Sequence, residues 1–110
     1  MIDTKQRAAI SDTFKNAGNR LLSPKEVTAI ASEQIPGLGI ATVYRNIKSM
    51  VESGELQAVM LPGQADRYAL AGYSSGAVLI NRDGSVLISN GLNEVSDVPR
   101  YTKHTYFIQK

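Results

Sequence analysis

The link Ile35-Pro36-Gly37-Leu38-Gly39 joins two segments that both repeat apolar residues at helical spacing. The segment before it begins at Ser23, a predicted N-cap, and Pro24 suits the first helical position. Glu26 stands three residues after Ser23 and completes a capping box. The segment after the link covers residues 40–53 and ends at a glycine. A link this short, rich in Pro and Gly, makes consecutive helices turn sharply, so it favours a helix-turn-helix.

An earlier helix is predicted over residues 4–17, because Gly18-Asn19 stops it. The residues expected to face a shared core are Ala8, Ala9, Ile10, Phe14 and Ala17 in the first helix, Val27, Ile30 and Ala31 in the second, and Ile40, Val43, Ile47, Met50 and Val51 in the third. After residue 54 the periodicity shifts toward two. Residues 56–61 and 67–70, separated by a turn at Pro62-Gly63, therefore read as a β-hairpin. Three helices followed by a hairpin predict a winged helix-turn-helix.

A second, smaller lobe is expected beyond the small-residue linker at 71–76. Residues 77–80 and 85–89 are apolar strands around a type I turn with a glycine bulge, and a last strand covers 101–108. The predicted class is α+β. It consists of a winged helix in residues 1–72 and a small antiparallel β dimerisation lobe in residues 73–110.

Several kinds of chemistry are excluded by composition. The chain has no Cys, so it can form neither a disulfide nor a thiolate metal site. Its one His, His104, reads as a surface or pairing residue of a strand, while Asp83 and Asp97 read as turn formers. No Ser or Thr stands in a recognisable nucleophile motif. We therefore expect no metal, no cofactor and no enzymatic activity.

The chain also lacks membrane and secretion signals. Its opening residues have no apolar signal-peptide core, and the longest purely apolar run is residues 77–80. We expect a cytoplasmic protein. The formal net charge of +2 does not by itself point to nucleic acid.

The outer face of the third helix carries the predicted DNA contacts. Arg45 could donate two hydrogen bonds to a guanine, and Tyr44 offers an aromatic edge to a thymine methyl group. Thr42, with the helix N-terminal amides, could hold a phosphate. Further phosphate contacts are expected from Lys48, Arg20 and Lys5. On the alternative interpretation, Tyr44 packs at the helix edge and both Arg45 and Lys48 are merely solvated.

Five segments occur in an order that resembles a known family. They are Thr4-Lys5-Gln6-Arg7, Leu22-Ser23-Pro24-Lys25-Glu26-Val27, Pro36-Gly37-Leu38-Gly39-Ile40-Ala41-Thr42-Val43-Tyr44-Arg45-Asn46-Ile47, Gly54-Glu55-Leu56 and Asp66-Arg67-Tyr68-Ala69-Leu70. The series resembles the N-terminal DNA-binding domain of the ferric uptake regulator family of bacterial repressors. The resemblance implies that Tyr44 and Arg45 match the family's base-reading pair. It also implies a sequence-specific, dimeric regulator of transcription that binds double-stranded DNA.

The sequence departs from the family pattern in both halves. Family members usually carry a helix and a basic arm ahead of the Thr-x-x-Arg segment, whereas this chain begins almost at it. Where the family has a His cluster and Cys-x-x-Cys pairs, this chain has residues 71–76 and the turn at 81–84. The last strand still matches, at residues 105–108. We therefore expect a metal-independent homodimer held by the strands after residue 76, including Val78, Leu87, Phe107 and Ile108. A winged-helix protein-interaction module that has lost DNA binding is the alternative.

Overall fold

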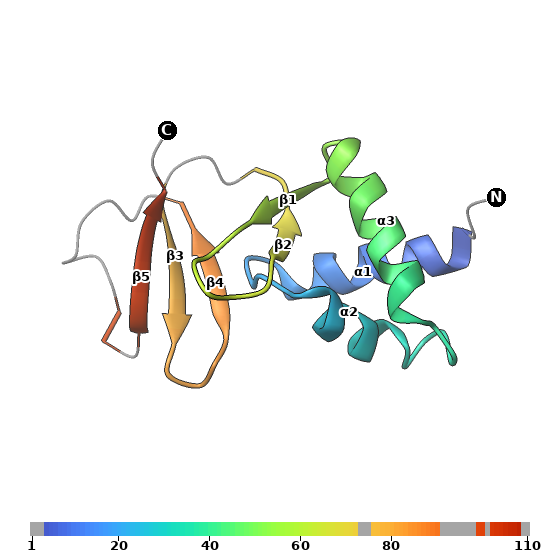
Figure 1. Cartoon of the computed structure of the whole chain (residues 1–110), viewed down its shortest axis with the longest axis horizontal. Coiled ribbons are helices and arrows are strands. Elements are labelled where there is room, and N and C mark those ends of the chain that lie inside the picture. Colours follow the sequence, from blue (N-terminus) through green and yellow to red (C-terminus); the bar gives the residue numbers. More distant parts are fainter. Residues whose placement is uncertain (1–3, 73–75, 91–98, 101, 109–110) are drawn as a thin grey trace.

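The computed structural model describes residues 4–72, 76–90, 99–100 and 102–108. Within these residues, three helices come first, followed by five strands. The elements are α1 (Thr4–Ala17), α2 (Pro24–Ala31), α3 (Ile40–Glu52), β1 (Leu56–Val59), β2 (Arg67–Leu70), β3 (Gly76–Asn81), β4 (Val86–Ser89) and β5 (Thr102–Ile108). The β1–β2 hairpin lies between the helices and the three-stranded sheet (Figure 1). This is the predicted α+β class.

Parts of three predicted features lie outside the described residues. These are positions 73–75 of the linker, residues 91–98 with Asp97, and Tyr101 at the start of the last strand. None of the helices that the structure does describe combines the length and the apolarity needed to cross a bilayer.

The predicted start of α2 is confirmed in detail. The backbone N–H of Glu26 donates to Ser23 Oγ at 3.3 Å, and the backbone N–H of Ser23 donates to Glu26 Oε1 at 3.1 Å. These two bonds satisfy donors that the first turn of a helix otherwise leaves unpaired. Gly37, in the link to α3, has φ +85°, a conformation that residues with a side chain rarely adopt. The sharp turn between the two helices therefore depends on glycine at this position.

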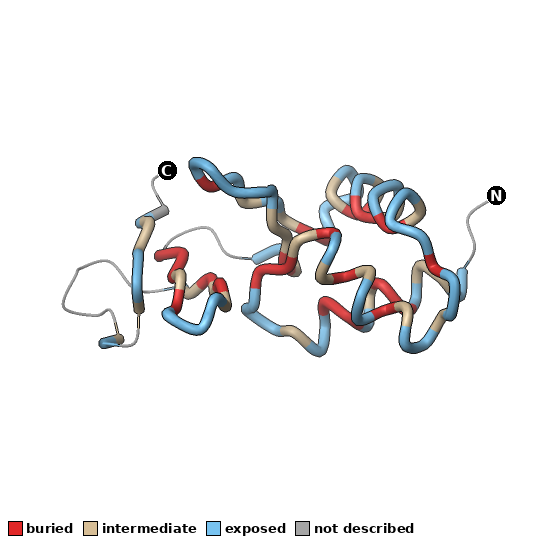
Figure 2. Tube along the Cα trace, turned by 60° about the horizontal axis from the view of Figure 1, so that its bottom comes forward, coloured by how far each residue is buried: buried red, intermediate tan, exposed pale blue. Residues whose placement is uncertain are grey.

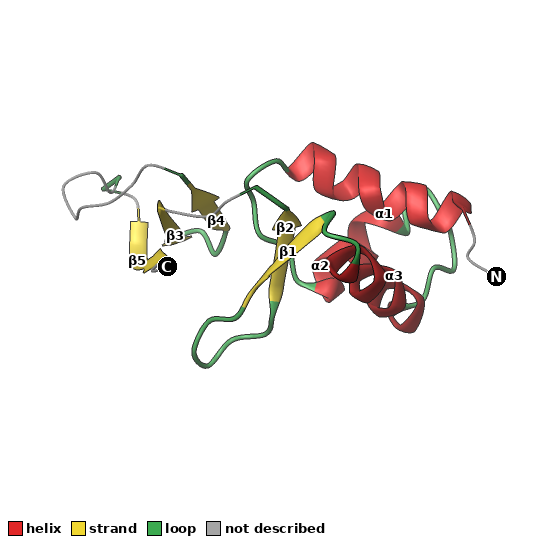
Figure 3. Ribbon diagram, turned by 90° about the horizontal axis from the view of Figure 1, so that it is seen from above, coloured by secondary structure: helices red, strands yellow, loops and turns green. Residues whose placement is uncertain are grey.

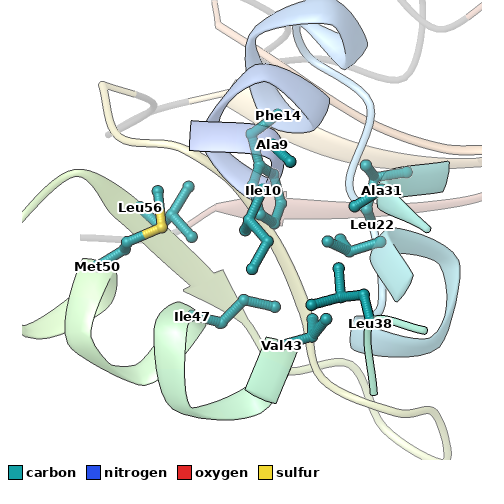
Figure 4. Close-up of a cluster of buried hydrophobic side chains, with 11 residues drawn as sticks. Ala9, Ile10, Phe14, Leu22, Ala31, Leu38, Val43, Ile47, Met50 and Leu56 are labelled. Atoms are coloured by element: carbon teal, nitrogen blue, oxygen red, sulfur yellow. The ribbon is translucent and has the colours of Figure 1, made fainter. Parts of the chain in front are cut away.

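The three helices and β1 enclose one hydrophobic cluster (Figure 4). Its buried members are Ala9, Ile10, Phe14, Leu22, Val27, Ala31, Leu38, Val43, Ile47, Met50 and Leu56. Three predicted core residues are instead exposed, namely Ala8, Ile30 at 40% and Ile40 at 45%. Ile30 is turned away because Val27 and Ala31 already define the buried stripe of the short helix α2. Ile40 is the first residue of α3, and Leu38 is buried near that end instead.

The strands form two antiparallel sheets. In the β1–β2 hairpin Leu56 pairs with Leu70 and Ala58 with Tyr68, and the loop joining these strands protrudes from the molecule (Figure 3). In the second sheet the strand order is β4-β3-β5. The predicted turn between β3 and β4 is present, and Gly84 within it has φ +91°.

The connection between α1 and α2 joins both sheets, which the sequence did not predict. On one side Leu21 N–H donates to the Val86 carbonyl at 2.7 Å, and Ile88 N–H donates to the Asn19 carbonyl at 2.8 Å. On the other side Leu22 and Tyr68 exchange two backbone hydrogen bonds of 2.9 Å each. Residues 19–22 thus act as a short strand between β4 and β2.

A second buried cluster lies at this junction. It contains Leu21, Leu61, Ala69, Val78, Val86 and Ile88, which come from the connection, the hairpin and the second sheet. Buried residues accordingly run from the helices into β3 and β4 (Figure 2). The predicted boundary at residues 72 and 73 is crossed by this cluster, and the division into two domains stays a prediction.

Candidate nucleic-acid interface

Helix α3 separates buried and exposed side chains cleanly. Val43, Ile47 and Met50 are buried against the other helices, as Figure 4 shows. Tyr44 and Arg45 stand on the opposite side, where Tyr44 is 52% exposed. About half of this aromatic side chain is open to water, so it is available to a ligand or partner.

The N-terminal end of α3 has polar groups suited to an anion. The N-cap is Gly39, which has no side chain that could accept hydrogen bonds from the first-turn amides. Such amides, with the positive end of the helix dipole, favour phosphate. Arg45 Nη2 donates to Thr42 Oγ1 at 3.2 Å, which orients the guanidinium along the same face. The structure thus brings Thr42 and Arg45 together at this end of α3, and their roles in binding DNA stay predictions.

A groove of about 500 Å³ lies between α3, from Tyr44 to Glu52, and the β1–β2 hairpin. Its lining residues are Tyr44, Arg45, Ile47, Lys48, Val51, Glu52, Ala58 and Tyr68. Three of the six predicted contact residues, Tyr44, Arg45 and Lys48, therefore border one concave surface. Thr42 does not line the groove, but it accepts a hydrogen bond from Arg45, which does.

Sequence reasoning did not single out the two hairpin residues of the groove, Ala58 and Tyr68. They are cross-strand partners on the same face of the hairpin as Leu56 and Leu70, which belong to or pack against the helical cluster, whereas Ala69 faces the second cluster. The alternation along β1 and β2 was the signal that could have placed Ala58 and Tyr68 on the face toward the helices. Burial, the negative charge of Asp66 and the neighbouring Tyr44 together raise the pKa of Tyr68.

The two remaining predicted contacts, Arg20 and Lys5, do not line the groove. Arg20 lies at the junction, where it bridges to Leu87 of β4 and its guanidinium is 3.4 Å from Glu26 Oε2. Glu26 also binds Arg67 at 2.6 Å. Burial alone would raise the pKa of Glu26, but the Ser23 backbone N–H and Arg67 together hold it below its usual range. Lys5 is exposed in the first turn of α1.

Arg7 fixes the position of α3 relative to α1. Its guanidinium forms an ion pair with Glu55 at 2.5 Å and donates to Ser49 Oγ at 3.3 Å. The first contact holds the start of the hairpin, and the second holds the third turn of α3. One side chain of α1 thereby connects both elements that border the groove.

Three helices with a tight turn between the second and third, followed by an antiparallel hairpin, define a winged helix-turn-helix protein. A sequence profile of the ferric uptake regulator family matches residues 2–104, so the chain belongs to that family. The expectation that the chain is not an enzyme is confirmed by this membership, because the family is one of regulators.

Solved structures of regulators share the fold. The Campylobacter jejuni peroxide stress regulator aligns with a TM-score of 0.64 and 20% identity, over 79% of this chain and 63% of that one. The Francisella tularensis ferric uptake regulator with iron aligns at 0.67 and 23%, over 83% and 70%. A zinc-bound manganese uptake regulator aligns at 0.70 and 20%, over 83% and 69%. The chain therefore spans under two thirds of the length of the Campylobacter protein. Comparison with curated protein sequences finds no match.

The donor groups of the residues that the structure describes do not fit the metals named for these relatives. The sequence has no Cys and a single His. Within the described ranges, no three His, Asp or Glu side chains come close enough to share an ion. His104 is exposed on β5, and its ring centroid lies 4.9 Å from that of Tyr106. A zinc or iron site needs several converging nitrogen, sulfur or oxygen donors, and the described part of the chain supplies none.

Proposed function

We propose that this protein is a sequence-specific DNA-binding regulator of transcription that reads DNA with α3. The observation that carries the proposal is the exposed set of Tyr44, Arg45 and Lys48 on a helix whose other face is buried. In a helix-turn-helix this helix enters the major groove, and residues near its N-terminus meet base edges. Thr42 and the amides after Gly39 add a phosphate contact, and Arg20 and Lys5 are assigned weaker ones.

Two alanine variants should separate base reading from phosphate binding. Arg45→Ala should cost about 1–3 kcal/mol on the best site and relax preference at one base pair per half-site. Lys48→Ala should weaken binding to all DNA sequences alike and make the affinity less dependent on salt, because a phosphate contact releases counterions without reading bases. Wild type and both variants would be titrated against specific and scrambled duplexes at several salt concentrations.

The matched control is Lys25→Ala, an exposed lysine of α2 that is absent from the groove. It should reproduce the wild-type discrimination between duplexes. If Arg45→Ala binds every duplex as wild type does, α3 is not the reader. The alternative of a winged-helix protein-interaction module that has lost DNA binding would then take its place.

We also propose a homodimer formed through residues 73–110. In the β4-β3-β5 sheet the outer edge of β4 is covered by residues 19–21, while within the described residues no strand pairs with the outer edge of β5. An open strand edge with an exposed Phe107 favours pairing with a second copy. The dimer would place two α3 helices in successive major grooves, so the preferred site should be an inverted repeat.

Light scattering at micromolar concentration should give twice the 11.9 kDa chain mass. Phe107→Glu should shift the protein to monomer, because it replaces the exposed apolar ring on this strand with a charge that the second copy would have to bury. Lys103→Glu, on an exposed position of the same strand that already carries a charge, serves as the control and should stay dimeric. A clean monomer mass for the wild type would refute this assembly.

We further propose that folding and DNA binding are independent of metal, with no cofactor, in a cytoplasmic protein. The reason is the donor set, because metal contributes to folding only where deprotonated ligands converge. Thermal melting with chelator and with added zinc, iron or manganese should give matching curves. A reproducible rise of the midpoint at stoichiometric metal would contradict the proposal.

A further inference from the structure

The groove between α3 and the β1–β2 hairpin is larger than base reading requires. Base contacts need the exposed tips of Tyr44 and Arg45, whereas the groove continues past them to Glu52 at the end of α3. Its volume of about 500 Å³ falls in the range of small-molecule sites, which is roughly 300–1,000 Å³. We propose that this groove binds a small planar aromatic carboxylate and that its occupation displaces DNA.

The walls of the groove favour a flat apolar body. Val51 and Ile47 of α3 form one side, and Ala58 of β1 contributes a small side chain on the other. Tyr44 and Tyr68 add two aromatic rings, one from each wall, and aromatic side chains pack well against a flat ring. The small Ala58 opposite Tyr68 is what keeps the space open.

The charges at the rim favour an anion. Arg45 and Lys48 supply two positive charges and Glu52 one negative charge, which leaves the lining with a net charge of +1. A single carboxylate complements this net charge of +1. A dianion would carry more negative charge than the lining can balance, and Glu52 would repel it. Tyr68 keeps its proton, because burial and the nearby Asp66 raise its pKa, so its hydroxyl can donate to the carboxylate.

Competition with DNA follows from shared residues. Tyr44 and Arg45 line the groove and also form the proposed base-reading pair. A ligand stacked on Tyr44, with its carboxylate on Arg45 or Lys48, occupies the groups that DNA needs. This second part rests on the proposed function, whereas binding of the ligand itself does not.

The test uses 1-naphthoate as the probe, with 1-naphthalenemethanol as its uncharged counterpart, on the full chain without DNA. Chemical shifts of the backbone amides would be followed during each titration. We expect saturable binding of 1-naphthoate, with the shifts confined to α3, β1 and β2. Lys48→Gln should weaken 1-naphthoate by about threefold to fivefold, as expected for a partly exposed charge pair, and leave the alcohol unchanged.

Two further variants test the location. Ala58→Phe fills the groove and should weaken 1-naphthoate by about tenfold or more. Ala65→Phe makes the same change at an exposed alanine of the same hairpin that does not line the groove, and should bind as wild type. Equal loss in both variants, or shifts spread over the whole chain, would overturn the proposal.

Competition is then measured on a fluorescent duplex in the presence of 1-naphthoate. A rise in the apparent Kd for DNA in wild type but not in Ala58→Phe supports displacement. If 1-naphthoate binds to the chain but does not change the apparent Kd for DNA, the proposed displacement is overturned, while the groove remains a ligand site. If the chain binds no DNA at all, the proposed function fails, while the titration without DNA still decides whether the groove is a ligand site.

Discussion

Phe14→Ala should lower the free energy of unfolding by about 3–5 kcal/mol, as burial of an aromatic core side chain predicts. Phe14 is fully buried on α1 and lies in the same cluster as Val43 and Ile47 of α3. Truncation leaves a cavity beneath the helix proposed to read DNA. Small proteins are stable by only about 5–15 kcal/mol, so this loss should be visible as a much lower urea midpoint.

The companion variant Phe14→Leu keeps most of the volume and should cost much less, roughly 1 kcal/mol. Ala8→Gly on the exposed side of α1 controls for weakening of the helix itself, which costs about 1 kcal/mol. An equal midpoint for Phe14→Ala and Phe14→Leu would show that the cluster around α1 does not stabilise the fold as the structure indicates.

The helical half of the fold could be predicted because each boundary has a local cause. Ser23 and Glu26 cap α2 whatever surrounds them. The helical spacing of apolar residues along α3 places Val43 and Ile47 inward without knowledge of the elements that pack against them. Ile30 and Ile40 were placed wrongly, because periodicity gives a direction but does not say how far a neighbouring helix extends.

The junction and half of the groove depend on contacts between distant parts of the chain. Residues 19–22 carry no strand pattern of their own, and they become extended because both β4 and β2 offer backbone partners. Tyr68 faces the groove because its pairing register with Ala58 is set by the hairpin as a whole. Tyr44 and Arg45 could be named from the sequence because a recognition helix presents them by its own geometry. The hairpin wall of the groove, with Ala58 and Tyr68, could not be named from the sequence.

Leu21→Ala should destabilise the whole protein in one step, by about 2–5 kcal/mol. Leu21 is fully buried in the cluster that joins the α1–α2 connection, the hairpin and the second sheet. Its backbone N–H also donates to Val86 of β4. The neighbouring Leu22 is in the helical cluster and pairs with Tyr68, so damage at this point reaches both cores at once. We expect amide signals of α3 and of β3 to disappear at the same urea concentration.

The control is Leu87→Ala, which removes the same atoms from a half-buried position of β4 that belongs to neither cluster. Its cost should be smaller, and its unfolding should also occur in one transition. If the signals of β3 are lost well before those of α3 in the wild type, the two parts are independent domains and α3 is free to reorient relative to β5. One shared transition means instead that the junction holds α3 at a fixed angle to the strand edge proposed to dimerise. In that case the spacing of the two half-sites is set by the fold itself, and a ligand can act on DNA binding only by blocking α3 directly.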